Sequence, residues 1–465
     1  MVVTKKLVLL PALSFAALAA VAEVAVDFSA VTGPVKPVNG VGQPPLLSYT
    51  GTSLFRYLKE AGIPYSRLHD VGGSFGKNVF VDIPNVFRDF DADENDPASY
   101  DFALTDMLLK ALEQHGVEPY FRLGVTIENA VEQGYPAYRI SPPKDFAKWA
   151  RVSERVIRHY TEGWANGFRM KITYWEIWGE PDNNPRVDRN PLWRAPFEEY
   201  IRFYGTVAPY LKAKFPHLKI GGYGSCGFYA GSAAGQVREK ASARAIYWVD
   251  CAKRFLARAR DEKWPLDFFS YHSYSTTFEA IRQMRYADEL LTEYGFTREK
   301  TERHLNEWLP YVSHQNLGSA LQAAGVAAEL VALQNGPCDV ACLYDARCGL
   351  GDYSPLFNPM TYKPHKAYCA FLAFNELRKL GQAVKVTGSS EDGDGEGLWV
   401  TAATDGKGKC AVLAVNLSEK PLPLPDFAAG RAVRARLIDE KSDFAETAPG
   451  TTLGGRSVVL IEFKL

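Results

Sequence analysis

The chain has 465 residues, and its 53 basic and 54 acidic side chains nearly balance. That balance argues against a large nucleic-acid-binding surface. The 46% hydrophobic content excludes a mainly disordered chain. A chain of this length can bury a full core and is typical of two or three domains.

The N-terminal sequence has the features of a signal peptide. Lys5 and Lys6 precede an apolar run over residues 7–22, which ends in the small-residue pattern AVA. A charged start, a short apolar stretch and a small-x-small end are typical of an export signal. The alternative is a membrane anchor, but the run is shorter than the ~20 residues that span a bilayer. We therefore expect export to the periplasm or the extracellular space, cleavage after Ala22, and no membrane span in the mature chain.

Short β-rich segments alternate with amphipathic helical segments along most of the chain. Eight segments are predicted as strands: residues 38–41, 65–69, 119–123, 172–178, 218–223, 267–272, 302–308 and 340–344. Helical periodicity occurs between them at residues 53–61, 102–115, 143–162, 197–215 and 319–333. Eight strands alternating with helices predict an α/β fold, a parallel sheet closed into a (β/α)8 TIM barrel, which we place at residues 38–381.

The pattern changes after a last predicted helix at residues 364–380. Five strand-like segments follow, separated by turn signals such as Asp-Gly: residues 384–386, 397–402, 410–416, 433–438 and 457–463. We expect residues 382–465 to form a small β-sandwich accessory domain. An early strand at residues 24–28 predicts that the N-terminal segment 23–37 joins this domain.

Two glutamates fall at the carboxyl ends of predicted strands, where TIM barrels place their active sites. Glu180 follows the fourth strand in the run WEIWGEPD (175–182), and Glu307 ends the seventh in LNEW (305–308). Burying a carboxylate among such Trp and apolar residues is expensive unless it has a role. A protonated carboxyl beside an ionised one is the arrangement that retaining glycosidases use. Two ordinary polar strand ends are the alternative interpretation.

The run WEIWGEPD resembles the acid/base strand of glycoside hydrolase clan A. The span of residues 38–380 resembles family 39 of that clan, which includes β-xylosidases and α-L-iduronidases. The segment NEW (306–308) is similar to the family's nucleophile strand, and FN (357–358) with PHKAY (364–368) to its last loop and helix.

This resemblance implies a (β/α)8 barrel with a β-sandwich. It also implies a retaining glycoside hydrolase, β-xylosidase-like or a related exo-glycosidase, acting on oligo- or polysaccharides; with the N-terminal signal, we expect this enzyme to be secreted. By the resemblance Glu180 is the general acid/base and Glu307 the nucleophile. No metal and no organic cofactor are implied, and the expected partner is a carbohydrate rather than nucleic acid. The sequence gives no indication of the oligomeric state.

One residue departs from the family pattern. The family has Asn immediately before the acid/base, where this chain has Gly179. In the family that Asn hydrogen-bonds the sugar 2-hydroxyl, a contact that strengthens in the transition state. Gly179 offers no side chain. Either another group replaces the amide, or the sugar differs at its 2-position, or activity is lost.

Further candidate binding residues lie at other strand ends. By resemblance, His272 and Tyr274 stand beside the nucleophile, where a hydrogen bond can hold a carboxylate ionised. His69 ends the second strand, close to a family histidine that contacts sugar, and Asp70 follows it. A packed strand end is the alternative for each of them.

Two tryptophans beside the glutamates, Trp178 and Trp308, are candidate sugar-stacking platforms, although packing in the core explains each of them nearly as well. A uronic acid would need cationic partners, for which Arg122 and Arg347 are candidates. Glu176 alternates with Ile177 on its strand and should point into the barrel, where it needs hydrogen bonds.

Two other classes of function stay open. A non-catalytic carbohydrate-binding protein on the same barrel would fit Gly179, although it would need neither glutamate. Two short motifs nominally support a redox or acyl-transfer enzyme. The run GYGSCG (222–227) matches the consensus of a dinucleotide-binding loop, and GGSFG (72–76) matches that of a nucleophile elbow. Neither run is followed by the helix that its motif requires, and glycine-rich turns produce such matches by chance.

Overall fold

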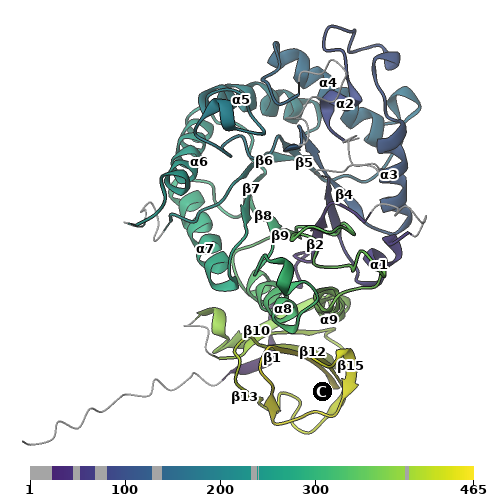
Figure 1. Cartoon of the computed structure of the whole chain (residues 1–465), viewed down its shortest axis with the longest axis vertical. Coiled ribbons are helices and arrows are strands. Elements are labelled where there is room, and N and C mark those ends of the chain that lie inside the picture. Colours follow the sequence, from purple (N-terminus) through teal and green to yellow (C-terminus); the bar gives the residue numbers. More distant parts are fainter. Residues whose placement is uncertain are drawn as a thin grey trace, which may run out of the picture.

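The computed structural model of the chain describes residues 24–45, 53–68, 81–127, 139–231, 238, 240–392 and 397–465. Figure 1 shows a ring of helices around a barrel, with the C-terminal strands packed below it. Eight parallel strands close the barrel in chain order. They are β2 (Gly40–Gly42), β3 (Tyr65–Leu68), β4 (Glu118–Leu123), β5 (Tyr174–Ile177), β6 (Lys219–Ser225), β7 (Phe268–Ser273), β8 (Glu302–Trp308) and β9 (Val340–Leu343). The predicted barrel fold is confirmed, and every predicted barrel strand overlaps one of these.

Helices cover the outside of the barrel (Figure 1). They are α1 (Phe55–Glu60), α2 (Ile83–Val86), α3 (Ala103–Gln114), α4 (Phe146–Thr161), α5 (Phe197–Lys214), α6 (Ala243–Asp261), α7 (Thr277–Glu293), α8 (Ala320–Asn335) and α9 (Lys366–Leu380). The periodic segments in the sequence correspond to α1, α3, α4, α5, α8 and α9. The sequence analysis did not identify α2, α6 or α7.

Helix α4 shows why these segments fold as they do. Its N-terminus is capped by Asp145, whose side chain accepts a hydrogen bond from the Lys148 amide. Trp149, Val152 and Val156 follow at helical spacing and are fully buried against the barrel.

A second unit of antiparallel strands packs beside α8 and α9. Its seven-stranded sheet has the order β1-β10-β11-β12-β17-β14-β15, and a two-stranded sheet pairs β13 with β16. The strands are β1 (Ala25–Pro34), β10 (Gln382–Thr387), β11 (Trp399–Thr404), β12 (Lys409–Asn416), β13 (Leu422–Pro423), β14 (Ala432–Ile438), β15 (Asp443–Thr447), β16 (Thr452–Leu453) and β17 (Ser457–Lys464). A TIM barrel with a C-terminal β-sandwich is thus the fold, and Figure 1 shows the purple strand β1 beside this late part of the chain.

Both faces of the large sheet are buried. Successive residues of a strand point to opposite faces, and on these strands both sets of residues are apolar. On β12, Ala411, Leu413 and Val415 belong to the core shared with the barrel. Val412 and Ala414 belong to a second core on the opposite face. Helix α8 is apolar all round and lies buried between barrel and sheet. The two units therefore share one continuous core across α8.

All seven cysteines are free, and six of them are buried, which fits small hydrophobic side chains. Within the described ranges, no helix has both the length and the apolarity needed to cross a membrane.

Candidate active site

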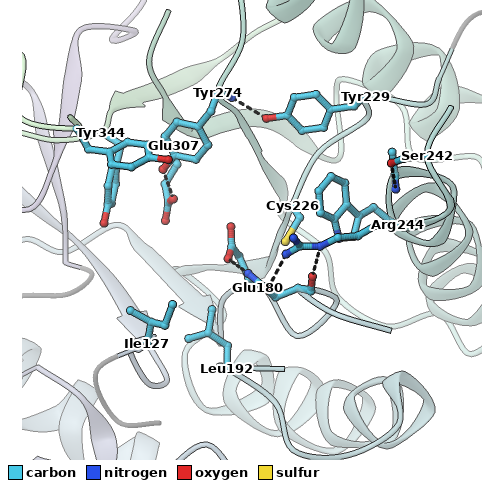
Figure 2. A pocket seen from close by; sticks show the side chains of 14 residues that line it. Ile127, Glu180, Leu192, Cys226, Tyr229, Ser242, Arg244, Tyr274, Glu307 and Tyr344 are labelled. Atoms are coloured by element: carbon cyan, nitrogen blue, oxygen red, sulfur yellow. Dashed lines mark hydrogen bonds between the residues drawn. The ribbon is translucent and has the colours of Figure 1, made fainter. Parts of the chain in front are cut away.

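A cavity of about 620 Å³ opens at the carboxyl ends of the barrel strands. Its lining residues come from the turns after β4, β5, β6, β7 and β9, from the start of α6 and from the end of β8. Figure 2 shows the Glu180 and Glu307 side chains entering the same cavity. This is the end of a TIM barrel at which catalytic groups are found.

Glu180 is held in a turn three residues beyond β5. The two residues that flank Gly179 both have positive φ values, 68° for Trp178 and 46° for Glu180, a conformation that costs energy and is often found at functional sites. The Glu180 amide donates to the Gly224 carbonyl at 2.9 Å and fixes the turn against β6. Its carboxyl group accepts a hydrogen bond on each oxygen, from His272 Nδ1 and from Asn183 Nδ2, both at 2.7 Å.

Glu307 is the penultimate residue of β8 and is almost fully buried. Arg67 Nη1 donates to Oε1 at 2.6 Å, and the Tyr274 hydroxyl donates to Oε2 at 2.5 Å. Burial, reinforced by the charge of Glu307, raises the pKa of Tyr274 well above its ordinary value, so its phenol stays protonated and remains a donor. Glu307 thus forms an ion pair with Arg67 and accepts a hydrogen bond from Tyr274.

His272 connects the two glutamates. Its Nδ1 lies 2.7 Å from Glu180 Oε1 and 3.3 Å from Glu307 Oε2. Burial disfavours the charged ring, but the charges of Glu307 and Glu180 outweigh burial and raise the pKa of His272. Burial likewise favours a neutral Glu180, but hydrogen bonds from His272 and Asn183 outweigh it and lower the pKa of Glu180.

The two carboxyl groups are close enough to act on one bond. A carboxylate oxygen of Glu180, one of Glu307 and a ring nitrogen of His272 all lie within 4.8 Å of one another. Retaining glycosidases place their two carboxyl groups about 5–5.5 Å apart, whereas inverting enzymes leave room for a water between them. One carboxyl can therefore attack a sugar carbon while the other serves the leaving group.

A buried polar layer supports the site from inside the barrel. Glu176 accepts hydrogen bonds from Arg67 Nε at 2.7 Å, Ser270 Oγ at 2.6 Å and Asn306 Nδ2 at 2.7 Å. Burial alone would raise the pKa of Glu176, but Arg67 and Ser270 outweigh it and lower the pKa. Arg67 thus bridges Glu176 and Glu307 and sets the position of the latter. Glu176 points inward with satisfied hydrogen bonds, as the alternation on its strand predicts.

The structure brings Glu180, Glu307, His272 and Tyr274 together in one site. His69 and Asp70 lie outside the described residues. The expectation that Trp178 and Trp308 stack on sugar is corrected, because both side chains are fully buried and neither lines the cavity. Trp178 instead packs against Trp149, Trp193 and Phe203, and its Nε1 donates to the Leu192 carbonyl.

Several residues of the site were missed in the sequence. Arg67 precedes the predicted candidate His69 by two positions, so strand alternation could have placed both on the inner face. The aromatic lining of the cavity had no local signal in the sequence, because its members are far apart along the chain. They are Tyr229, Trp248, Tyr344 and Tyr353. Asn183 and Arg244 were missed for the same reason.

Comparisons with known structures agree with the fold. The chain has 18% identity to the glucosidase from Croceicoccus marinus, with a TM-score of 0.70 over 95% of this chain and 98% of that one. It has 18% identity to a GH39 β-xylosidase from Caulobacter crescentus, with a TM-score of 0.63 over 95% and 99% of the two chains. At this identity these solved structures support the fold alone.

Sequence comparison goes further. The β-xylosidase of Geobacillus stearothermophilus is 25% identical over 207 residues, which cover 43% of this chain and 36% of that relative. The chain thus matches little more than a third of the length of that relative. Residues 53–312, more than half of the chain, match the model of glycosyl hydrolases family 39. The span holds Glu180 and Glu307 with the arginine, histidine and tyrosine that contact them, and the chain belongs to glycosyl hydrolases family 39.

Proposed function

We propose that the protein is a retaining glycoside hydrolase in which Glu307 is the nucleophile and Glu180 the general acid/base. The observation that carries this proposal is the pair of carboxyl groups within 4.8 Å in unlike surroundings. Glu307 forms an ion pair with the Arg67 guanidinium and accepts a hydrogen bond from the Tyr274 phenol. Glu180 contacts His272, with which it can share a proton.

In the first step, Glu307 attacks the anomeric carbon of the sugar, and the bond from that carbon to the leaving oxygen breaks. Glu180 transfers its proton to that oxygen, so that the leaving group departs as a neutral alcohol. The product of this step is a glycosyl ester on Glu307. Glu307 loses its negative charge when this ester forms. His272 and Arg67 keep the Glu307 oxygens in place through the contacts described above.

In the second step, Glu180 acts as a base. It takes a proton from water, the water oxygen bonds to the anomeric carbon, and the ester bond to Glu307 breaks. The nucleophile regains its charge next to Arg67 and Tyr274, both of which are positioned before the reaction starts. Two inversions at one carbon return the original anomeric configuration.

The proposed substrate is a β-xyloside or a related glycoside cleaved from a chain end. Support comes from the relatives, two of which are named as β-xylosidases and one as a glucosidase. The cavity offers apolar tyrosine and tryptophan surfaces of the kind on which sugar rings pack.

The experiment is hydrolysis of a panel of aryl glycosides by the wild-type protein and by Glu307→Gln, with the anomer of the product followed by NMR. We expect release from at least one xyloside or glucoside, retention of configuration, and loss of nearly all turnover in Glu307→Gln. Glu446→Gln, an exposed carboxylate on β15, is the matched control. Inversion, or full activity of Glu307→Gln, would contradict the mechanism. Sugar binding without release from any glycoside would favour the carbohydrate-binding alternative.

We also propose that the protein is exported and that residues 1–22 are removed. The support is the charged start and the apolar run of the N-terminal sequence. N-terminal sequencing of protein recovered from the periplasm or the medium should begin at Glu23. Recovery of the uncleaved chain from the cytoplasm would contradict this proposal.

A further inference from the structure

The start of helix α6 forms one wall of the active-site cavity. Ser242, Arg244, Ala245 and Trp248 all line the cavity. Arg244 and Trp248 are four residues apart, so they share one face of the helix. The Arg244 Cζ atom lies 5.0 Å from the centre of the Trp248 ring, so the cation rests on the indole. The mechanism proposed above gives none of these side chains a role.

This wall lies on the side of Glu180 that faces away from Glu307. Glu180 Oε1 lies 2.7 Å from the His272 ring, which also contacts Glu307. Glu180 Oε2 accepts instead from Asn183 Nδ2 at 2.7 Å, and Asn183 is the residue that Arg244 contacts. Figure 2 shows Arg244 beyond Glu180 as seen from Glu307. A leaving group that is protonated by Glu180, and departs from a sugar held at Glu307, therefore extends toward Arg244.

Arg244 is held in place, but one edge of its guanidinium group is unused. Nε donates to the Asn183 carbonyl and Nη2 to Asn183 Oδ1, both at 2.8 Å. A guanidinium group carries five N–H donors, so three remain, two on Nη1 and one on Nη2. Nη1 and the outer N–H of Nη2 form an edge that can bind both oxygens of one carboxylate.

The charge of Arg244 also lacks a counterpart. Among the residues that the structure describes, Arg244 forms no ion pair, and its two contacts are the neutral amide of Asn183 and the indole of Trp248. Its side chain is exposed, so an anion can reach it without a large desolvation cost. A carboxylate next to the reacting bond would be repelled by Glu307, whereas one on the far side of the leaving group meets Arg244 first.

We propose that Arg244 selects glycosides whose leaving group carries a carboxylate. The inference rests on the proposed function, because Glu180 marks the leaving-group side only as the acid/base. The carboxylate can belong to a uronic acid unit of a polysaccharide or to an aromatic acid, and both present the same planar group to the free guanidinium edge. Arg244 is then a specificity-determining residue, and Asn183 and Trp248 position it.

The test uses two pairs of glycosides, each built on the sugar that the protein cleaves or binds best in the panel above. One pair has 3-carboxyphenyl and 3-carbamoylphenyl leaving groups, and the other has glucuronic acid and glucose as the leaving sugar. Arg244→Gln removes both the charge and the free edge. We expect kcat/KM for the acidic member of a pair to fall about 3- to 10-fold relative to the neutral member, the range between an exposed ion pair and a charged hydrogen bond.

The ratio within a pair separates recognition from other effects of the substitution. Both members depend on the same acid, so a change at Glu180 or partial unfolding lowers both activities equally. Arg258→Gln, on the same helix but exposed and paired with Glu262, is the control and should leave the ratio unchanged. An unchanged ratio in Arg244→Gln for both pairs would overturn the inference. A shift confined to one pair would support it and identify the source of the carboxylate as a uronic acid or an aromatic acid.

A binding measurement keeps this inference distinct from the proposed hydrolysis. If the wild-type protein cleaves none of the four compounds, calorimetric titration with the same compounds replaces kinetics. Tighter binding of the acidic member that disappears in Arg244→Gln, but persists in Arg258→Gln, would support the role of Arg244 while the hydrolase proposal fails. Equal binding of the two members by the wild-type protein, or binding of neither, would overturn that role.

Discussion

At the scale of single residues, Glu180 combines its proposed role as acid with surroundings that favour its charged form. Burial raises its pKa, but hydrogen bonds from His272 and Asn183 outweigh burial and lower it below the ordinary value. The acid form therefore prevails only at low pH, and it is lost as pH rises through this lowered pKa. A glycoside with a poor leaving group needs that proton, whereas a nitrophenyl glycoside hardly does.

We therefore expect kcat/KM for an alkyl glycoside to be highest at acidic pH and to decline toward neutrality. The optimum for the matching nitrophenyl glycoside should lie at higher pH. Profiles of kcat/KM against pH for the two substrates check this, since that ratio reports groups of the free enzyme. Coincident profiles would contradict the assignment of Glu180 as the acid.

A second residue-scale prediction concerns Arg244, which lines the cavity and holds Asn183 in place. Its Nε donates to the Asn183 carbonyl and its Nη2 to Asn183 Oδ1, both at 2.8 Å. This leaves the Asn183 NH2 group directed at Glu180. Arg244→Ala should weaken that hydrogen bond and let the pKa of Glu180 rise toward its ordinary value.

The alkaline limb of the alkyl-glycoside profile should accordingly move to higher pH in Arg244→Ala. Arg254→Ala, on the same helix but paired with Glu198 and Asp250, is the control. Identical profiles for the two variants would show that Arg244 does not act on Glu180.

The sequence predicted the residues of this site unevenly, for physical reasons. Glu180, in the turn after a strand, and Glu307, near the end of one, could be proposed as candidates because the sequence pattern at each position is local. The prediction that Trp178 stacks on sugar was wrong. The local sequence is the same whether a Trp beside a candidate catalytic residue packs into the core or faces the cavity. Arg67 and Arg122 could have been placed on the barrel interior by alternation, but the contact of Arg67 with Glu307 joins two strands that are far apart in the sequence. Such contacts exist only once the barrel closes.

At the scale of elements, the barrel strands were predicted better than the helices. Each barrel strand is a short β-rich segment that can be recognised locally, although buried polar residues such as Arg67, Arg122 and Glu176 interrupt its apolar residues. Helix α6 was missed because seven of its 19 residues are charged, and its apolar face is interrupted in the sequence. Its start is marked by Ser242, whose side chain accepts from the Ala245 amide. Caps of this kind are the signal that could have identified it.

The cap of α4 leads to a prediction about stability. Asp145 Oδ1 accepts from the Lys148 amide at 2.9 Å and satisfies a donor at the helix start. Asp145→Ala should lower the free energy of unfolding by about 1 kcal/mol. Urea unfolding followed by circular dichroism measures this. Asp261→Ala, at the end of α6 where a negative charge is unfavourable, should be neutral or slightly stabilising. Equal losses in both variants would contradict a capping role.

At the scale of the whole molecule, the first and last parts of the chain form one sheet. β1 pairs with β10, so residues 25–34 lie against residues 382–387. Val24 is buried in the second core of the sandwich, and Val26 and Phe28 pack against it. The proposed cleavage after Ala22 would leave this strand intact, with Glu23 as the single residue before Val24.

A chain that begins at Val35 should therefore be less stable than one that begins at Glu23. Removing one largely buried and two partly buried apolar side chains costs on the order of 3–5 kcal/mol. The active site lies at the carboxyl ends of the barrel strands and takes no residue from β1. The shorter chain should thus show a lower Tm but the same kcat/KM well below that temperature. Since α8 joins the barrel and the sheet in one core, a single unfolding transition is expected for both chains. Two separate transitions, or a loss of kcat/KM that accompanies the lower Tm, would mean that the sandwich affects the site and does not only stabilise the barrel.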